Sequence, residues 1–134
     1  PNYERDNLDS TAALLQGQGL PSRLMVDCSH GNSNKDYRRQ AEVADQVAQQ
    51  VRAGSRHVMG VMLESHLVAG NQRIPADLGQ LTYGQSITDA CIDLDSTAAV
   101  LAELAEAVRA TAVSSEVPQR LEPALATPTG TRVP

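Results

Sequence analysis

The spacing of apolar positions along the chain predicts helices and strands in alternation. Residues 8–15 carry apolar side chains every three or four positions, which is typical of one helix face. A short apolar run over 23–28 predicts a strand, and a helix is expected over 35–53. The nearly continuous apolar run over 57–63 predicts a second strand, buried on both faces as in a parallel sheet. This alternation indicates an α/β domain.

The second half of the chain is less regular. An irregular stretch is expected over 65–85. A loop of that length is uncommon in a compact domain, and it is usually either functional or a sign that its elements have been wrongly assigned. A third short strand is expected over 86–92, and a final helix over 96–112 with Ser96 as its N-cap. The predicted helices and strands therefore span residues 1–112. The remaining 113–134, rich in Pro, Ala and Thr and without periodicity, predict a disordered tail.

The composition indicates a globular domain and disfavours two classes of partner. The chain has 134 residues, of which 41% are apolar and 20% charged, enough for a single core. Aromatic residues make up only 2% and the net charge is −5, so a nucleic-acid surface is not expected. No run approaches the roughly 20 apolar residues of a membrane span. Two cysteines without a secretory leader predict a reducing, cytoplasmic setting and no disulfide.

Reactive side chains follow each predicted strand. Asp27 and His30 come after the first strand, Glu64 directly after the second, and Asp89 lies in the third. Parallel strands joined by right-handed crossovers bring their carboxyl ends to one side of a sheet, where α/β proteins carry their sites. An imidazole and two carboxylates that meet there suit a divalent metal, Mn²⁺ or Fe²⁺ first, with Zn²⁺ or Co²⁺ as alternatives.

Each of these residues also has a purely structural interpretation. His30 could bond a backbone carbonyl in its polar loop, and Asp89 could cap a helix. Glu64 is harder to explain in that way, because a carboxylate at the end of a buried strand is partly desolvated and needs a partner. Cys28 and Cys91 are interpreted as core residues, His57 as a surface residue and His66 as a supporting or structural residue. Lys35, Arg38 and Arg39 are interpreted as a solvated helix face, with contact to a phosphate as the alternative.

Three motifs carry a resemblance to a known family. They are MVDCSHGNSNK over 25–35, GVMLESHLVAGNQ over 60–72 and LTYGQSITDACI over 81–92. Together they resemble class I 3-deoxy-D-arabino-heptulosonate-7-phosphate synthase, in the right order and over about residues 1–112. Several linked motifs make this resemblance far more specific than one short pattern.

The resemblance implies a fold and a reaction. The family folds as a (β/α)₈ TIM barrel of about 250 residues, so three strands correspond to its C-terminal part, about three βα units. The enzyme condenses phosphoenolpyruvate with erythrose 4-phosphate and releases phosphate, the first step of the shikimate route to aromatic amino acids. It needs a divalent metal held by Cys, His, Glu and Asp, and its full-length form is expected to be a homo-oligomer. The motif match assigns the last three ligands to His30, Glu64 and Asp89.

The chain also departs from the family pattern. The Cys ligand has no counterpart, and most of the Arg and Lys residues that hold the substrate phosphates belong to strands that are missing. We therefore expect this chain alone to be inactive and poorly folded. Two alternatives stay open: a related synthase that joins phosphoenolpyruvate to another aldose phosphate, and a noncatalytic half-barrel that binds a metal or a partner.

Overall fold

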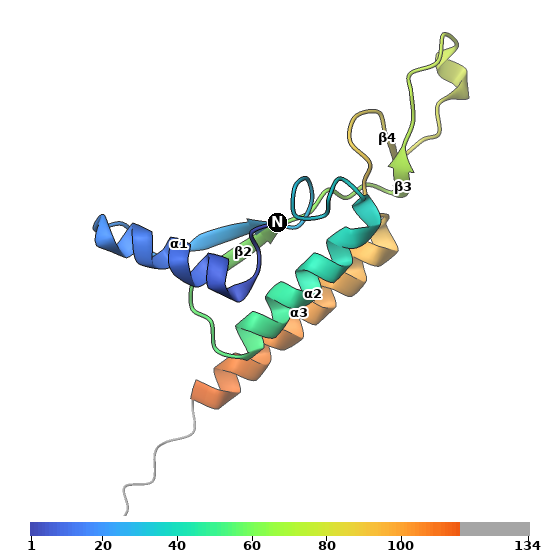
Figure 1. The fold of residues 1–134 in the computed structure, drawn as a ribbon. Helices are drawn as coiled ribbons and strands as arrows, with labels where there is room; N and C mark the ends of the chain where they lie inside the picture. Colours follow the sequence, from blue (N-terminus) through green and yellow to red (C-terminus); the bar gives the residue numbers. More distant parts are fainter. Residues whose placement is uncertain (116–134) are drawn as a thin grey trace, which may run out of the picture.

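The computed structural model describes residues 1–115, without the side chains of 113–115. It has a mixed α/β fold (Figure 1). The elements in chain order are α1 (Arg5–Gly17), β1 (Leu24–Asp27), the 3₁₀ helix η1 (Tyr37–Arg39), α2 (Gln40–Arg52), β2 (Val58–Met62), β3 (Val68–Asn71), the 3₁₀ helix η2 (Leu78–Gln80), β4 (Gln85–Ser86) and α3 (Leu94–Ser115). The predicted alternation of helices and strands is confirmed for the first half of the chain.

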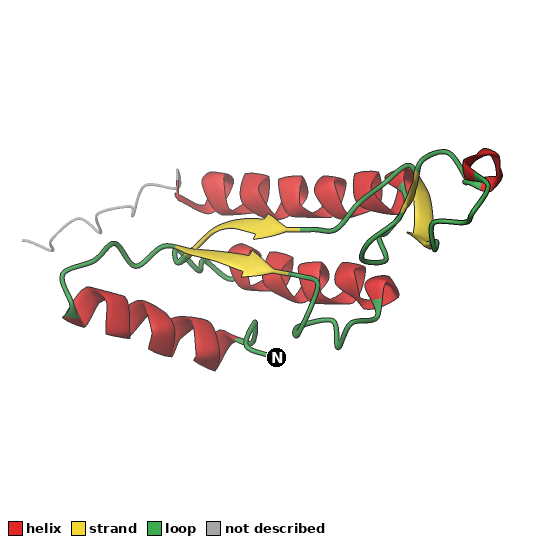
Figure 2. Ribbon diagram, turned by 90° about the horizontal axis from the view of Figure 1, so that it is seen from above, coloured by secondary structure: helices red, strands yellow, loops and turns green. Residues whose placement is uncertain are grey.

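The core lies between the β1–β2 pair and the helices. These two strands are parallel, with Val26 opposite Val61 and Asp27 opposite Met62. Helices α2 and α3 lie side by side along the pair (Figures 1 and 2). The buried cluster that joins strands and helices consists of Tyr3, Leu8, Val26, Cys28, Val43, Ala44, Val47 and Val100.

The opposite side of the β1–β2 pair is open in the part of the chain that the structure describes. Met25 is 64% exposed and Met59 is 59% exposed, whereas Val26, next to Met25 in β1, is buried. The prediction that the second strand is buried on both faces is therefore wrong for this chain, because helices cover one face only. Long apolar side chains on the other face indicate a surface suited to further packing.

The predicted irregular stretch after β2 contains a strand. β3 pairs in parallel with β4, and the segment that carries them projects beyond the helices (Figure 1). Gly70 within β3 has a φ of +83°, a backbone conformation that residues other than glycine rarely adopt. This irregular backbone and the polar sequence around it explain why strand periodicity is weak here.

The predicted third strand over 86–92 is only partly formed. Ser86 ends β4, and the chain then bends through 87–89 before it pairs again at two isolated bridges. Ile92 is parallel to Ser65, since the Ile92 N–H donates to the Glu64 carbonyl at 2.9 Å and His66 N–H donates to the Ile92 carbonyl at 3.0 Å. The bend places Asp89 in a loop instead of a strand.

Two helices begin at other residues than predicted. Asn34 and Lys35 have positive φ angles of 54° and 59°, so the helix expected from residue 35 starts with η1 and continues as α2. Helix α3 begins at Leu94, and the Asp93 carboxylate accepts the Ser96 N–H at 2.8 Å. Asp93 is thus the capping residue, and the prediction that Ser96 caps the helix is wrong.

Helix α3 is longer than predicted, and both cysteines are buried. Helix α3 continues to Ser115, three residues past its predicted end at residue 112, while 116–134 lie outside the described residues. None of the described helices is both long enough and apolar enough to cross a membrane. Cys28 and Cys91 are free and buried, which confirms their interpretation as small core residues.

Candidate metal centre

The loop after β1 holds His30 in a fixed orientation. His30 has a φ of 44°, and its carbonyl accepts the Lys35 N–H at 2.8 Å, which closes a tight turn. Its Nδ1 lies 2.8 Å from Oδ2 of Asp27, and the other Asp27 oxygen accepts the Ser29 N–H at 2.7 Å. With Nδ1–H donating to Asp27, the lone pair of Nε2 is left for another partner.

Glu64 follows β2 and is held through both its backbone and its side chain. The Ser29 hydroxyl donates to Oε2 at 3.2 Å. The Gln40 side-chain oxygen accepts the Glu64 N–H at 2.8 Å, and the Gln40 amide nitrogen donates to the Glu64 carbonyl at 3.1 Å. The half-buried Glu64 carboxylate is therefore anchored from the loop after β1 and from the start of α2.

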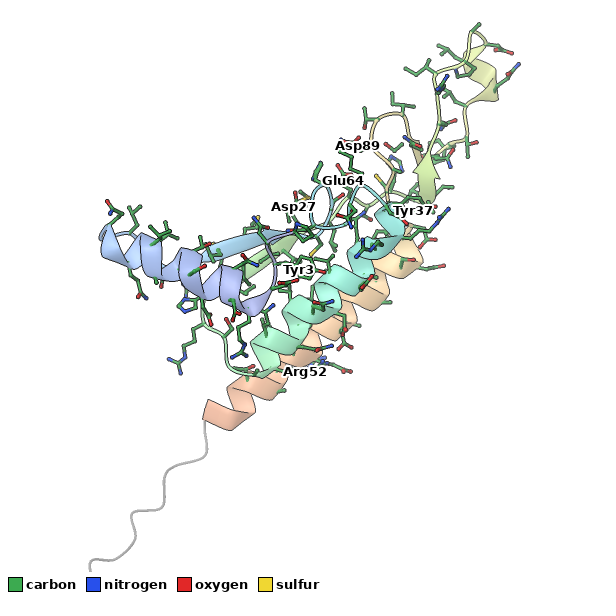
Figure 3. All side chains as sticks on the ribbon, in the orientation of Figure 1. Tyr3, Asp27, Tyr37, Arg52, Glu64 and Asp89 are labelled. Carbon is green, nitrogen blue, oxygen red and sulfur yellow. The ribbon has the colours of Figure 1, made fainter. Side chains whose placement is uncertain are left out.

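The three predicted site residues come together. Nε2 of His30 lies 3.5 Å from Oε1 of Glu64 and 4.0 Å from Oδ2 of Asp89. One ligand atom from each residue lies within 4.8 Å of the other two. Figure 3 shows Glu64 and Asp89 close together, next to Asp27 at the carboxyl end of β1. The rule that strand ends converge thus accounts for His30 and Glu64, whereas Asp89 reaches the same point from a loop.

A cavity of about 170 Å³ opens next to the cluster. The residues that line it are Ser29, His30, Lys35, Tyr37, Glu64, Asp89 and Ala90. Lys35 therefore belongs to the cavity wall; it is exposed, as predicted, but it lies in the turn before η1 and not on a helix. The left-handed backbone of Asn34 and Lys35, which apolar periodicity does not indicate, keeps Lys35 out of the helix.

Electrostatics in the cluster favour a cation. The hydrogen bond that His30 donates to Asp27 raises the pKa of His30 above its usual 6.5, and the negative charges of Asp27, Glu64 and Asp89 raise it further. Burial opposes this rise in the pKa and does not cancel it. A site that stabilises a protonated imidazole also suits a metal cation, which would compete with that proton.

The donor set fits a divalent metal. It offers one imidazole nitrogen and carboxylate oxygens from two residues, a combination typical of Mn²⁺ and Fe²⁺ sites. Asp27 supplies the second-layer carboxylate that commonly fixes the tautomer of a ligating histidine. Cys28 stands apart from this set: its thiol is fully buried, and burial raises its pKa to about 12.

Other candidates lie away from the cluster. Nδ1 of His57 is 3.1 Å from the Ser22 carbonyl, and Nδ1 of His66 accepts the N–H of the next residue at 2.9 Å. The Arg38 guanidinium lies 5.3 Å from the centre of the Tyr37 ring. Arg39 pairs with Glu42 at 3.4 Å. These contacts fit the structural or surface interpretation of all four side chains.

Three supporting residues, Asp27, Ser29 and Gln40, were not assigned a role from the sequence. Asp27 lies at the end of a predicted strand, so its position was visible although its partner was not. Gln40 occupies a buried position of α2, and a polar residue adds nothing to an apolar periodicity. A polar side chain on the core face of a predicted helix is the one signal that could have found it.

Comparisons with known proteins identify the family of the chain. The fold is mixed α/β, and the family model of the DAHP synthetase I family matches residues 1–102. The chain belongs to that family, which confirms the resemblance seen in its motifs.

The individual matches are consistent. A phospho-2-dehydro-3-deoxyheptonate aldolase of Alternaria alternata is 49% identical over 108 residues, which cover 80% of this chain and 29% of the relative. The Tyr-sensitive aldolase of Escherichia coli is 45% identical over 104 residues, covering 78% of this chain and 29% of the relative. A solved aldolase of Francisella tularensis has a TM-score of 0.78 at 43% identity, covering 83% of this chain and 32% of that one. The chain spans about 30% of the length of such relatives.

Proposed function

We propose that the protein which carries this chain condenses phosphoenolpyruvate with erythrose 4-phosphate to give 3-deoxy-D-arabino-heptulosonate 7-phosphate and phosphate. The observation that supports this most is the meeting of His30, Glu64 and Asp89 at one point, on a chain that belongs to the DAHP synthetase I family. In this proposal the chain supplies three metal ligands, and the remaining substrate contacts come from outside it.

The proposed architecture is the last part of a (β/α)₈ barrel, formed by residues 1–112. The parallel β1–β2 pair and the parallel bridge at Ile92 give three neighbouring strand positions in chain order. The helices lie on one face, as the outer layer of a barrel would. The exposed methionines of β1 and β2 would then face the barrel interior.

His30, Glu64 and Asp89 would hold a divalent metal, with Mn²⁺ or Fe²⁺ as the preferred ions. When bound, such an ion supplies Lewis-acid polarisation of the acceptor aldehyde. Asp27 keeps the Nε2 lone pair of His30 directed at the cluster, and Ser29 restrains one oxygen of Glu64.

Lys35 lines the same cavity as Glu64 and Asp89. It is the one lysine or arginine among the residues that line the cavity. A charged hydrogen bond to a substrate phosphate or carboxylate contributes enough that Lys35→Met should raise the KM about tenfold. Arg56→Met, at the opposite end of β2, serves as the matched loss of a cation and should leave the KM unchanged.

The reaction is tested on the full-length polypeptide that contains this chain. Metal-stripped and Mn²⁺-loaded protein are compared for consumption of phosphoenolpyruvate with erythrose 4-phosphate, arabinose 5-phosphate or ribose 5-phosphate. We expect turnover with erythrose 4-phosphate that depends on added metal. Turnover only with another aldose phosphate would replace this proposal by a related synthase, and none with any acceptor would favour a noncatalytic protein.

Variants of His30 and His66 distinguish a proposed metal ligand from a nearby histidine outside the cluster. His30→Ala should lower kcat by about 100-fold or more, since it removes one ligand of the proposed metal. His66 is an exposed residue two positions from Glu64, and His66→Ala should keep near-normal turnover. Equal losses in both variants would contradict the assigned role of His30.

A further inference from the structure

The side chain of Gln40 is fully buried, with 0% of its surface exposed. It is the first residue of α2 and follows directly on the loop and 3₁₀ helix that carry His30 and line the cavity. A buried amide without partners is costly, so both of its polar atoms must be satisfied inside the protein. Both of them bond to one residue, Glu64.

The two bonds fix the amide in a single orientation. Oε1 accepts the Glu64 N–H at 2.8 Å, and Nε2 donates to the Glu64 carbonyl at 3.1 Å. A flipped amide would set donor against donor and acceptor against acceptor. Gln40 thus pairs with the backbone of Glu64 through one donor and one acceptor, as a neighbouring strand would.

The pairing of Gln40 with Glu64 lies beyond the point where the backbone pairing of β1 with β2 ends. The last backbone bond between β1 and β2 joins the Cys28 N–H to the Met62 carbonyl at 2.9 Å, after which the chain turns into the His30 loop. From the third strand position, the Ile92 N–H also donates to the Glu64 carbonyl at 2.9 Å. The Glu64 backbone is therefore held by a strand segment and by the Gln40 amide.

We infer that Gln40 is a positioning residue for the candidate metal centre. Its buried amide fixes the backbone of Glu64, and so keeps the Glu64 carboxylate within reach of His30 and Asp89. Ser29 restrains the carboxylate itself through its hydroxyl, at 3.2 Å from Oε2. This inference rests on the proposed function, because it gives Gln40 its role through the metal ligand that it holds.

The test uses Gln40→Met in the full-length polypeptide. Methionine keeps most of the volume of the side chain and removes both hydrogen bonds. Mn²⁺ affinity is measured by electron paramagnetic resonance from the signal of free Mn²⁺, at a temperature where all variants are folded. We expect the affinity to fall about 10- to 100-fold, the loss typical when a residue that orients a ligand is removed.

Two further variants separate positioning from stability. Val47→Ala, at a fully buried position on the same helix, should lower the thermal midpoint but keep the Mn²⁺ affinity of the wild type. Gln40→Glu retains an acceptor for the Glu64 N–H and should recover part of the affinity lost in Gln40→Met. An unchanged affinity in Gln40→Met, or equal losses in Gln40→Met and Val47→Ala, would overturn the inference.

A metal-free measurement distinguishes this inference from the proposed function. Hydrogen exchange at the Glu64 amide should accelerate in Gln40→Met and stay slow in Val47→Ala. If the wild type fails to bind Mn²⁺, the proposed metal centre is contradicted and the positioning role is overturned with it. If the wild type binds Mn²⁺ while Glu64 exchanges equally fast with and without Gln40, only the positioning role fails.

Discussion

At the scale of single residues, the candidate centre depends on side chains that are not themselves donors in the cluster. Asp27 sets the direction of the His30 ring, Ser29 restrains a Glu64 oxygen, and Gln40 holds the Glu64 backbone. The last two bonds join Glu64, which follows β2, to the loop after β1 and to the start of α2. The donors are consequently arranged before any ion arrives, and preorganisation of this kind favours tight and selective binding.

The His30–Asp27 pair makes metal binding dependent on pH. A protonated imidazole has no lone pair for a metal, and Asp27 raises the pKa of His30 above 6.5. Mn²⁺ affinity should therefore begin to fall at a higher pH than it would with an unperturbed histidine. In Asp27→Asn the fall should shift to lower pH, while the affinity at pH 8 drops about 10- to 100-fold through lost orientation. Identical pH profiles of the two proteins, from calorimetric titrations, would contradict the role of Asp27.

The Cys28 thiol should be inert in the folded protein. It is fully buried, and burial raises its pKa to about 12, so almost no thiolate forms near neutral pH. We expect iodoacetamide at pH 8 to leave the peptide with Cys28 unmodified until denaturant is added, as read by mass spectrometry. Rapid modification of the native protein would show that this part of the core opens.

At the scale of elements, the sequence was informative where burial is regular. The apolar runs locate β1 and β2 to within a residue or two, and their ends lead to His30 and Glu64. Segments with exceptional backbone angles could not be found in this way. Because Lys35 has a left-handed backbone, the helix begins later than predicted and the Lys35 side chain lines the cavity. Gly70, with its positive φ, weakens the strand pattern of β3. Gln40 could not be identified from the sequence, because its burial depends on hydrogen bonds to Glu64, which is distant in sequence.

Helix α3 depends on its charged N-cap. The hydrogen bond from Ser96 lowers the pKa of Asp93 below its usual 3.8. A lowered pKa in the folded state means that the stabilising effect is present above that usual value. The effect is lost as the pH falls through the lower folded-state pKa.

Asp93→Asn tests this cap, because asparagine caps nearly as well but carries no charge. The thermal midpoint of the wild type should approach or drop below that of Asp93→Asn as the pH is lowered from 6 to 3. Parallel curves for the two proteins across this range would contradict the cap.

At the scale of the whole molecule, the open face of the β1–β2 pair is the main feature. Met25 and Met59 are more than half exposed there, while the other face of the same strands is covered by helices. A sheet with one open face and unpaired edges tends to associate with itself. The chain also spans about 30% of the length of its relatives, so most of the proposed barrel lies outside it.

The 134-residue chain alone should therefore lack activity and associate. Light scattering during gel filtration is expected to show assemblies instead of a monomer. Addition of phosphoenolpyruvate, erythrose 4-phosphate and Mn²⁺ should give no product. Robust turnover by the isolated monomer would contradict both the barrel architecture and the need for contacts from outside the chain.

The central claim is that His30, Glu64 and Asp89 form a metal centre, and calorimetry tests it most directly. Metal-stripped full-length protein is titrated with Mn²⁺ as the wild type, as Glu64→Gln, and as Glu42→Gln, the last an exposed carboxylate on α2. The account predicts a single saturable site, weakened about 100-fold or more in Glu64→Gln and unchanged in Glu42→Gln. Absence of Mn²⁺ binding in the wild type, or equal binding in all three proteins, would contradict it.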